Sequence, residues 1–197
     1  MKRPAVFIDR DGTINEQLGY INHESRFVIF PFVAEAVKLL NDSGFLAIVV
    51  TNQSGIGRGY YPEALVLELH DRLRDKLAEI GARLDNIYYC PHHPHAELKA
   101  FREDCNCRKP RTGLIDLALK DFDIDMTRSY VVGDRYVDID FAKRASLAGV
   151  LVKTGYGMGE IEYKSEGSPV PEYMAEDLLD AVKWILEREG TVGEKSP

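Results

Sequence analysis

Residues 5–15, Ala-Val-Phe-Ile-Asp-Arg-Asp-Gly-Thr-Ile-Asn, decide the fold of this chain. The first four residues form an apolar run of a length typical of a buried strand rather than a helix. Asp9 and Asp11 follow directly, and Gly12 marks a turn. Two carboxylates at the end of a buried strand are costly unless a cation lies between them. Mg²⁺ prefers such oxygen ligands, so the stretch is consistent with a magnesium site, although an ordinary turn fits the fragment alone equally well.

Strand-like and helix-like segments alternate along the rest of the chain. The expected strands are 5–8, 45–50, 87–89, 129–132 and 149–152. The expected helices are 32–41, 62–84, 114–119, 137–145 and 174–188, with a loop rich in Gly and Pro at 154–172. Nearly continuous apolar strands are typical of a parallel sheet covered on both faces. We therefore expect a Rossmann-like α/β fold without a large cap domain, with one domain over residues 1–189 and a flexible tail at 190–197.

The composition limits the class of function. Hydrophobic residues make up 45% of the 197 residues, which is enough for a full core. The net charge of −7 excludes bulk attraction to nucleic acid or to anionic membranes. No apolar run approaches the length of a membrane span, and the N-terminus leads into the first strand without a cleavage site. We expect a cytoplasmic protein that is a monomer and has neither a nucleic-acid nor a membrane partner.

Polar residues follow four of the expected strands at the point where each strand ends. They are Asp9, Thr51, Cys90 and Asp134. The carboxyl ends of parallel strands meet at one edge of the sheet, where ligands bind. This arrangement predicts phosphoryl transfer, with Asp9 as the nucleophile, Asp11 as the general acid and base, and Asp134 completing the Mg²⁺ site.

Two further residues complete the predicted chemistry. Thr51 supplies a hydroxyl, and the backbone N–H groups after it are suited to a phosphate. Lys109 supplies a compact cation for the nucleophile and the phosphoryl oxygens. Each residue also has an ordinary structural interpretation: Thr51 as a helix cap, Lys109 as a surface residue, and Asp134 with Asp138 as a turn and a solvated face. The order of all these residues along the chain favours the catalytic interpretation.

The cysteines indicate a zinc loop over residues 90–107. The pattern C-x-H-x12-C-x-C is formed by Cys90, His92, Cys105 and Cys107. Three thiolates and one imidazole are typical of a closed, structural zinc site. His93 and His95 compete with His92 as the fourth ligand, and the alternative is buried small cysteines with surface histidines. Such a loop would fix Arg108 and Lys109 at the mouth of the site.

Four motifs in this order resemble the haloacid-dehalogenase-like phosphatases. They are Asp-Arg-Asp-Gly-Thr at 9–13, Thr-Asn-Gln-Ser-Gly at 51–55, Lys109-Pro110 and Gly133-Asp134. The resemblance covers about residues 5–153. It implies an Mg²⁺-dependent phosphatase with an aspartate nucleophile on a Rossmann-like fold. It also implies that Asp11 gives its backbone carbonyl to Mg²⁺.

The zinc loop and residues 51–59 narrow the resemblance to the heptose bisphosphate phosphatases, and histidinol-phosphate phosphatases share the same zinc-bearing architecture. The narrower resemblance implies removal of a 7-phosphate during synthesis of surface polysaccharide, such as lipopolysaccharide. It also implies substrate contacts by Gly19, Tyr20, Thr51, Asn52, Gln53, Ser54, Arg108, Lys109 and Arg135. In this set the residues 51–54 would hold the transferring phosphate, and Arg135 would lie near the metal and the distal phosphate.

Three functions remain open at this stage. A small phosphorylated sugar carrying two phosphates would explain a surplus of local cations, namely Arg58, Arg108, Arg111 and Arg135. Histidinol phosphate carries an amine, which those cations disfavour. An inactive, zinc-stabilised binding module is the third possibility, and the complete set of catalytic residues argues against it.

Overall fold

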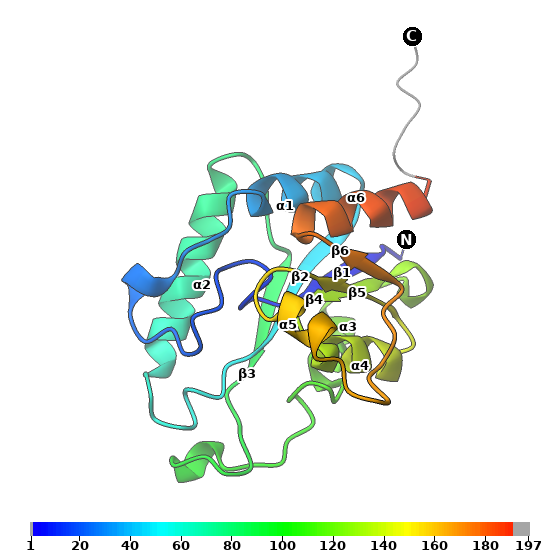
Figure 1. Cartoon of the computed structure of the whole chain (residues 1–197). Helices are drawn as coiled ribbons and strands as arrows, with labels where there is room; N and C mark the ends of the chain where they lie inside the picture. The colour runs from blue at the N-terminus through cyan, green and yellow to red at the C-terminus, as the bar shows by residue number, and fades with distance from the viewer. Residues whose placement is uncertain (1, 191–197) are drawn as a thin grey trace.

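The computed structural model describes residues 2–190, which are built around a six-stranded parallel sheet (Figure 1). The strands are β1 (Ala5–Ile8), β2 (Leu46–Asn52), β3 (Asn86–Cys90), β4 (Tyr130–Gly133), β5 (Ala148–Val152) and β6 (Tyr173–Ala175). Their order across the sheet is β3-β2-β1-β4-β5-β6. Because β1 lies between β2 and β4, Asp9 is at the middle of the carboxyl edge. The expected Rossmann-like α/β fold is confirmed.

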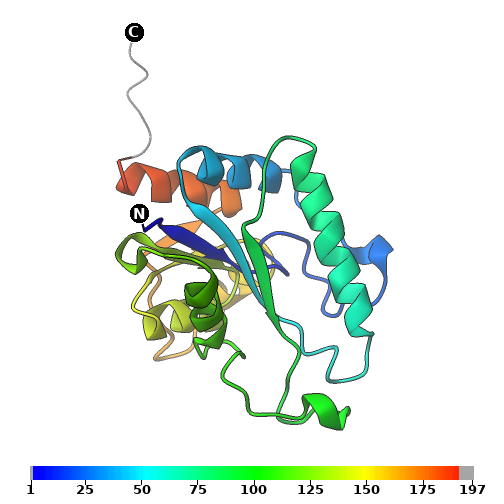
Figure 2. The same ribbon diagram turned by 180° about the vertical axis from the view of Figure 1, so that it is seen from behind.

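Helices cover both faces of this sheet (Figures 1 and 2). They are α1 (Val33–Asp42), α2 (Glu63–Ala78), α3 (Gly113–Asp121), α4 (Tyr136–Arg144), α5 (Gly157–Glu162) and α6 (Leu178–Arg188). Short 3₁₀ helices lie at Glu24–Arg26, Lys99–Phe101 and Met126–Arg128. Across residues 2–190 no large cap domain stands apart from the sheet, and no helix is both long and apolar enough to cross a membrane.

The central strand shows why the sheet is covered on both sides. Val6 and Ile8 point into the core that contains α1, α2 and α6, whereas Ala5 and Phe7 point into the core that contains α3 and α4. All four side chains are fully buried. Since successive strand residues face opposite sides, an unbroken apolar run requires an apolar layer on each face.

Two helix predictions and one loop prediction differ from the structure. The helix expected over 62–84 ends at Ala78, because the chain turns at Gly81, which adopts a φ of +73° that favours glycine. The helix expected over 174–188 begins only at Leu178, and Tyr173–Ala175 adds strand β6 beside β5. The expected loop at 154–172 contains α5. Three-residue strands and six-residue helices are too short to give a periodic pattern. Residues 191–197 of the expected tail lie outside the described part.

Candidate active site

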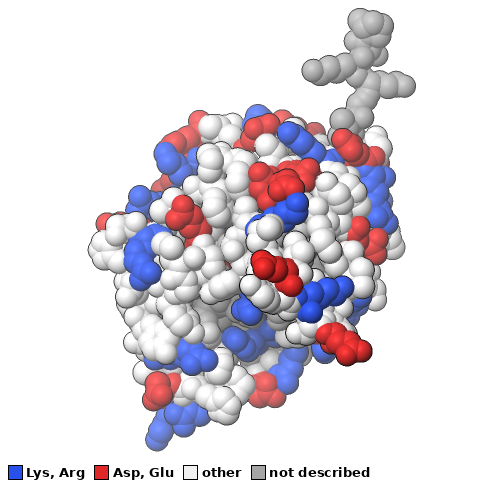
Figure 3. Space-filling view, viewed as in Figure 1, with Lys and Arg blue, Asp and Glu red and all other residues white. Residues whose placement is uncertain are grey.

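The carboxyl edge of the sheet opens into a polar cavity of about 270 Å³. Every predicted catalytic and substrate-binding residue except Gln53 lines it: Asp9, Asp11, Gly19, Tyr20, Thr51, Asn52, Ser54, Arg108, Lys109 and Arg135. Gln53 is buried behind the wall, where its Nε2 donates to Thr51 Oγ1 at 2.9 Å. On the face drawn in Figure 3, Lys and Arg side chains gather around a hollow below the centre.

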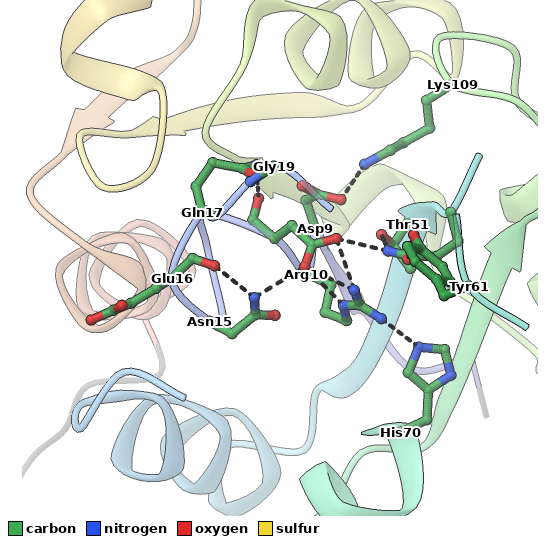
Figure 4. A network of polar contacts seen from close by, with 12 residues as sticks. Asp9, Arg10, Asn15, Glu16, Gln17, Gly19, Thr51, Tyr61, His70 and Lys109 are labelled. Atoms are coloured by element: carbon green, nitrogen blue, oxygen red, sulfur yellow. Dashed lines mark hydrogen bonds and ion pairs between the residues drawn. The ribbon is translucent and has the colours of Figure 1, made fainter. Parts of the chain in front are cut away.

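Lys109 links two carboxylates at the floor of the cavity. Its Nζ donates to Asp9 Oδ1 and to Asp138 Oδ1, both at 2.6 Å (Figure 4 draws the contact with Asp9). Burial alone would lower the pKa of Lys109, but the charges of Asp138 and Asp9 raise it well above its ordinary value. Asn52 binds the backbone of Lys109, accepting from its N–H at 3.0 Å and donating to its carbonyl at 3.2 Å. A permanently charged ammonium group is therefore fixed against Asp9.

Asp9, Asp134 and Asp138 place carboxylate oxygens within 4.8 Å of one another. Burial, together with the charges of its acidic neighbours, raises the pKa of Asp134 to about 8, and burial raises that of Asp9 to about 6. Asp134 Oδ2 accepts from the Tyr156 N–H at 2.8 Å, whereas the buried Asp134 Oδ1 has no hydrogen-bond partner. A buried cluster of carboxylates with an unpartnered oxygen fits a hard divalent cation such as Mg²⁺.

The side chain of Asp11 lies outside this cluster of carboxylates. It accepts hydrogen bonds from Arg10, from Asn15 Nδ2 at 3.0 Å and from Gln53 Nε2 at 2.7 Å. Burial would raise the pKa of Asp11, but the adjacent Arg10 guanidinium and these hydrogen bonds hold it below its usual value. Only the backbone carbonyl of Asp11 therefore remains as a candidate metal ligand, which is the group that the family resemblance implied.

The structure differs from the sequence analysis at three side chains. Asp138, which the sequence analysis named only in the alternative of a turn and a solvated face, is 1% exposed. Its place in the first turn of α4, four residues after Asp134, was a usable signal. Arg10, equally buried, was unassigned, although it stands between two aspartates in an otherwise buried stretch. Arg111, expected among the local cations for a second phosphate, does not line the cavity, and it donates instead to the Cys105 carbonyl at 2.8 Å and to Asp104.

The four predicted zinc ligands meet beside the cavity. Cys90 Sγ to Cys105 Sγ is 3.4 Å, Cys105 Sγ to Cys107 Sγ is 3.2 Å, and His92 Nδ1 to Cys107 Sγ is 3.3 Å. A zinc tetrahedron with Zn–S bonds of about 2.3 Å has edges of about 3.8 Å, so small movements of these atoms would let them hold the ion. Contacts with the Cys90 and Cys105 side chains lower the pKa of the Cys107 thiol to about 5, although burial opposes this.

The histidine of this cluster is His92. The Nε2 atom of its ring lies 3.7 Å from a Glu103 carboxylate oxygen, an orientation common for metal-binding histidines. His93 instead contacts the Arg58 guanidinium through Nε2 at 2.8 Å, and His95 is exposed. The donor set of three sulfurs and one imidazole nitrogen fits Zn²⁺.

The carboxylate cluster predicts how stability depends on pH and on Mg²⁺. Folded Asp134 keeps its proton up to about pH 8, whereas an unfolded aspartate loses it near pH 4. The unfolded state then binds fewer protons, so the metal-free protein should lose stability as pH rises from 6.5 to 8. Mg²⁺ binds the ionised cluster and should raise the melting temperature more at pH 8 than at pH 6.5.

Thermal unfolding with and without added Mg²⁺ at the two pH values measures this effect. The Asp134→Asn variant is the control, because it should lose both the pH dependence and the gain from Mg²⁺. Equal Mg²⁺ effects in the wild type and in this variant would contradict the assignment of the cluster.

Comparison with known proteins identifies the family. The HAD-hydrolase-like family model matches residues 106–181. A D-glycero-D-manno-heptose-1,7-bisphosphate 7-phosphatase of Thermosynechococcus vestitus is 43% identical over 189 residues, covering 94% of this chain and 96% of that protein. The D-glycero-beta-D-manno-heptose-1,7-bisphosphate 7-phosphatase of Yersinia pestis is 39% identical over 186 residues, covering 94% and 96%.

Similarity to a solved structure supports the same family. The D,D-heptose 1,7-bisphosphate phosphatase of B. bronchiseptica, complexed with magnesium and phosphate, superposes with a TM-score of 0.83 at 28% identity. The match covers 94% of this chain and 99% of that one. The chain is thus a phosphomonoester hydrolase and belongs to the haloacid-dehalogenase-like phosphatases, as the four motifs indicated.

Proposed function

We propose that this enzyme removes the 7-phosphate of D-glycero-D-manno-heptose 1,7-bisphosphate through an aspartyl phosphate on Asp9, with Mg²⁺ at the catalytic site. The observation that carries the proposal is the contact of 2.6 Å between Lys109 and Asp9 at the floor of a cavity lined by Arg58, Arg108 and Arg135. A charged floor suits the transferring phosphate, and a cationic rim suits a second one. The names of the relatives support this substrate.

In the first half of the proposed reaction, a carboxylate oxygen of Asp9 attacks the phosphorus atom. The bond from phosphorus to the sugar oxygen breaks, and Asp11 gives that oxygen a proton. Asp11 must first take up this proton from solvent, because Arg10 holds its pKa below the usual value in the free enzyme. Lys109 offsets the charge that gathers on Asp9 and on the phosphoryl oxygens. Mg²⁺, held by Asp9, Asp134 and the Asp11 carbonyl, would neutralise charge so that carboxylate and phosphate can approach.

In the second half, Asp11 takes a proton from water as the water oxygen attacks the phosphorus of the aspartyl phosphate. The bond between phosphorus and Asp9 breaks, which releases inorganic phosphate and restores both carboxyl groups. Thr51 Oγ1 and the backbone N–H groups of Asn52 and Ser54 are proposed to bind the phosphoryl oxygens. Residues 1–189 act as one phosphatase domain, and a structural Zn²⁺ in the loop 90–107 holds Arg108 at the rim.

Substrate preference tests this proposal. Phosphate release is measured with Mg²⁺ from both anomers of heptose 1,7-bisphosphate and from histidinol phosphate. We expect kcat/KM for a heptose bisphosphate to exceed that for histidinol phosphate by about 100-fold, because arginines paired with a second phosphate contribute about 2–3 kcal/mol.

The Arg108→Met variant is the matched control for this comparison. This variant should lower kcat/KM for the heptose bisphosphate and leave kcat/KM for histidinol phosphate nearly unchanged, so that the ratio of the two values falls. A higher kcat/KM for histidinol phosphate would contradict the proposed substrate but would leave the proposed mechanism standing. Phosphorus NMR of the product, expected to be the 1-phosphate, checks which ester bond breaks.

A further inference from the structure

We propose that Arg10, supported by His70, is a positioning residue that holds the Asp11 carboxylate toward the cavity for proton transfer. The inference rests on the proposed function, in which Asp11 is the general acid and base. Arg10 itself does not line the cavity, so its effect on the reaction passes through Asp11.

The Arg10 guanidinium donates hydrogen bonds to both oxygens of the Asp11 carboxylate. Its Nη2 donates to Oδ1 at 2.8 Å and to Oδ2 at 2.9 Å, and its Nε donates to Oδ1 at 3.2 Å. The side chain of Asp11 remains 18% exposed and faces the cavity. A planar fork on two oxygens fixes the plane of a carboxylate, which a single point charge does not.

His70, from α2, fixes the other side of the guanidinium (Figure 4). Arg10 Nη1 lies 3.2 Å from His70 Nε2. Because a guanidinium group only donates, Nε2 must be the unprotonated, accepting nitrogen of a neutral ring. The His70 ring is 2% exposed and contacts the Tyr89 ring at 5.6 Å between centroids, so its direction is set by packing.

The arrangement is specific to Asp11. Within residues 2–190, every hydrogen bond of the Arg10 side chain goes to Asp11 or to His70. The guanidinium also lies over the Phe27 ring, 5.5 Å from its centroid, in a place that is 1% exposed. Burying a charge at this depth is unfavourable unless its partner is well aligned. Without Arg10, the amide groups of Asn15 and Gln53 are the side-chain donors that the described residues would still offer the carboxylate.

The dependence of the rate on the leaving group tests this role. A sugar alkoxide needs a proton to leave, whereas p-nitrophenolate leaves without one. Since kcat/KM reports the steps through formation of the aspartyl phosphate, we compare kcat/KM for heptose 1,7-bisphosphate and for p-nitrophenyl phosphate. Arg10→Met should lower the first value about 100-fold and the second less than threefold, approaching the pattern of Asp11→Asn.

Substitutions at His70 keep the test independent of whether Arg10→Met folds. His70→Leu, which removes the acceptor, should lower the ratio of the two kcat/KM values about tenfold. His70→Gln, which keeps an acceptor oxygen, should restore part of it, and Arg10→Lys should lie between the wild type and Arg10→Met. Leu77→Ala, in the same helix and away from the cavity, controls for lost stability and should leave the ratio unchanged.

The positioning role of Arg10 and His70 would be overturned if kcat/KM fell equally for both substrates and if the size of the fall tracked the loss of melting temperature in each variant. Failure of the wild type to release phosphate from either ester would instead overturn the proposed function. The two failures are therefore distinguishable in one set of assays.

Discussion

The Asp9→Asn variant is expected to lose phosphatase activity by a factor on the order of 10⁴ or more, because an amide cannot act as the nucleophile. Its fold should remain intact, since the amide has the same shape and its oxygen can still accept from Lys109 Nζ. Burial raises the pKa of Asp9 to about 6, so its ionised form disfavours folding at neutral pH. The neutral amide should therefore melt no lower than the wild type when Mg²⁺ is absent.

Phosphate release at saturating Mg²⁺ measures the loss of activity, and thermal unfolding measures whether the fold remains intact. Asp140→Asn is the matched control, because Asp140 lies on α4 near the site but pairs with Arg144 instead of lining the cavity. It should keep wild-type turnover. More than about 1% residual activity in Asp9→Asn, with deamidation excluded by mass spectrometry, would contradict the assignment of the nucleophile.

The fold was predictable because its strands carry their own pattern. The expected strand at 5–8 matches β1, and its four apolar residues already imply layers on both faces. Strand β6 was not predictable from local sequence, because Tyr173–Ala175 is held by pairing with β5 rather than by a pattern of its own.

The site residues that could be predicted are mainly those that directly follow a strand. The structure brings Asp9, Thr51 and Lys109 to one cavity, as their order along the chain indicated. The contacts that hold the site residues in place were harder to predict, since His70 on α2 contacts Arg10, directly after β1, only in the folded chain. A histidine in an amphipathic helix gives no sign of such a partner sixty residues away.

The zinc loop leads to the second large effect. The Cys107→Ser variant is expected to lose its bound zinc and about 3 kcal/mol of unfolding free energy, because a structural metal contributes directly to folding. For a domain of this size the melting temperature should fall by about 6–12 °C. Metal analysis and thermal unfolding of the purified protein measure both changes.

Catalysis should suffer less than stability in this variant. Lys109 is held by Asp9, Asp138 and the amide of Asn52, contacts that do not involve the loop sulfurs. Arg108 depends on the loop, since its Nη1 donates to the His92 carbonyl at 3.4 Å. We therefore expect KM for a bisphosphate to rise more than kcat falls.

Matched histidine variants decide which ring completes the site. His92→Ala should lose zinc as Cys107→Ser does, because His92 Nδ1 lies 3.3 Å from Cys107 Sγ. His95→Ala should keep the zinc content and melting temperature of the wild type, since the exposed His95 ring lies outside the cluster. Wild-type zinc content and melting temperature in Cys107→Ser would show that the four residues do not hold a structural metal. Loss of zinc in His95→Ala, with retention in His92→Ala, would move the fourth ligand to His95.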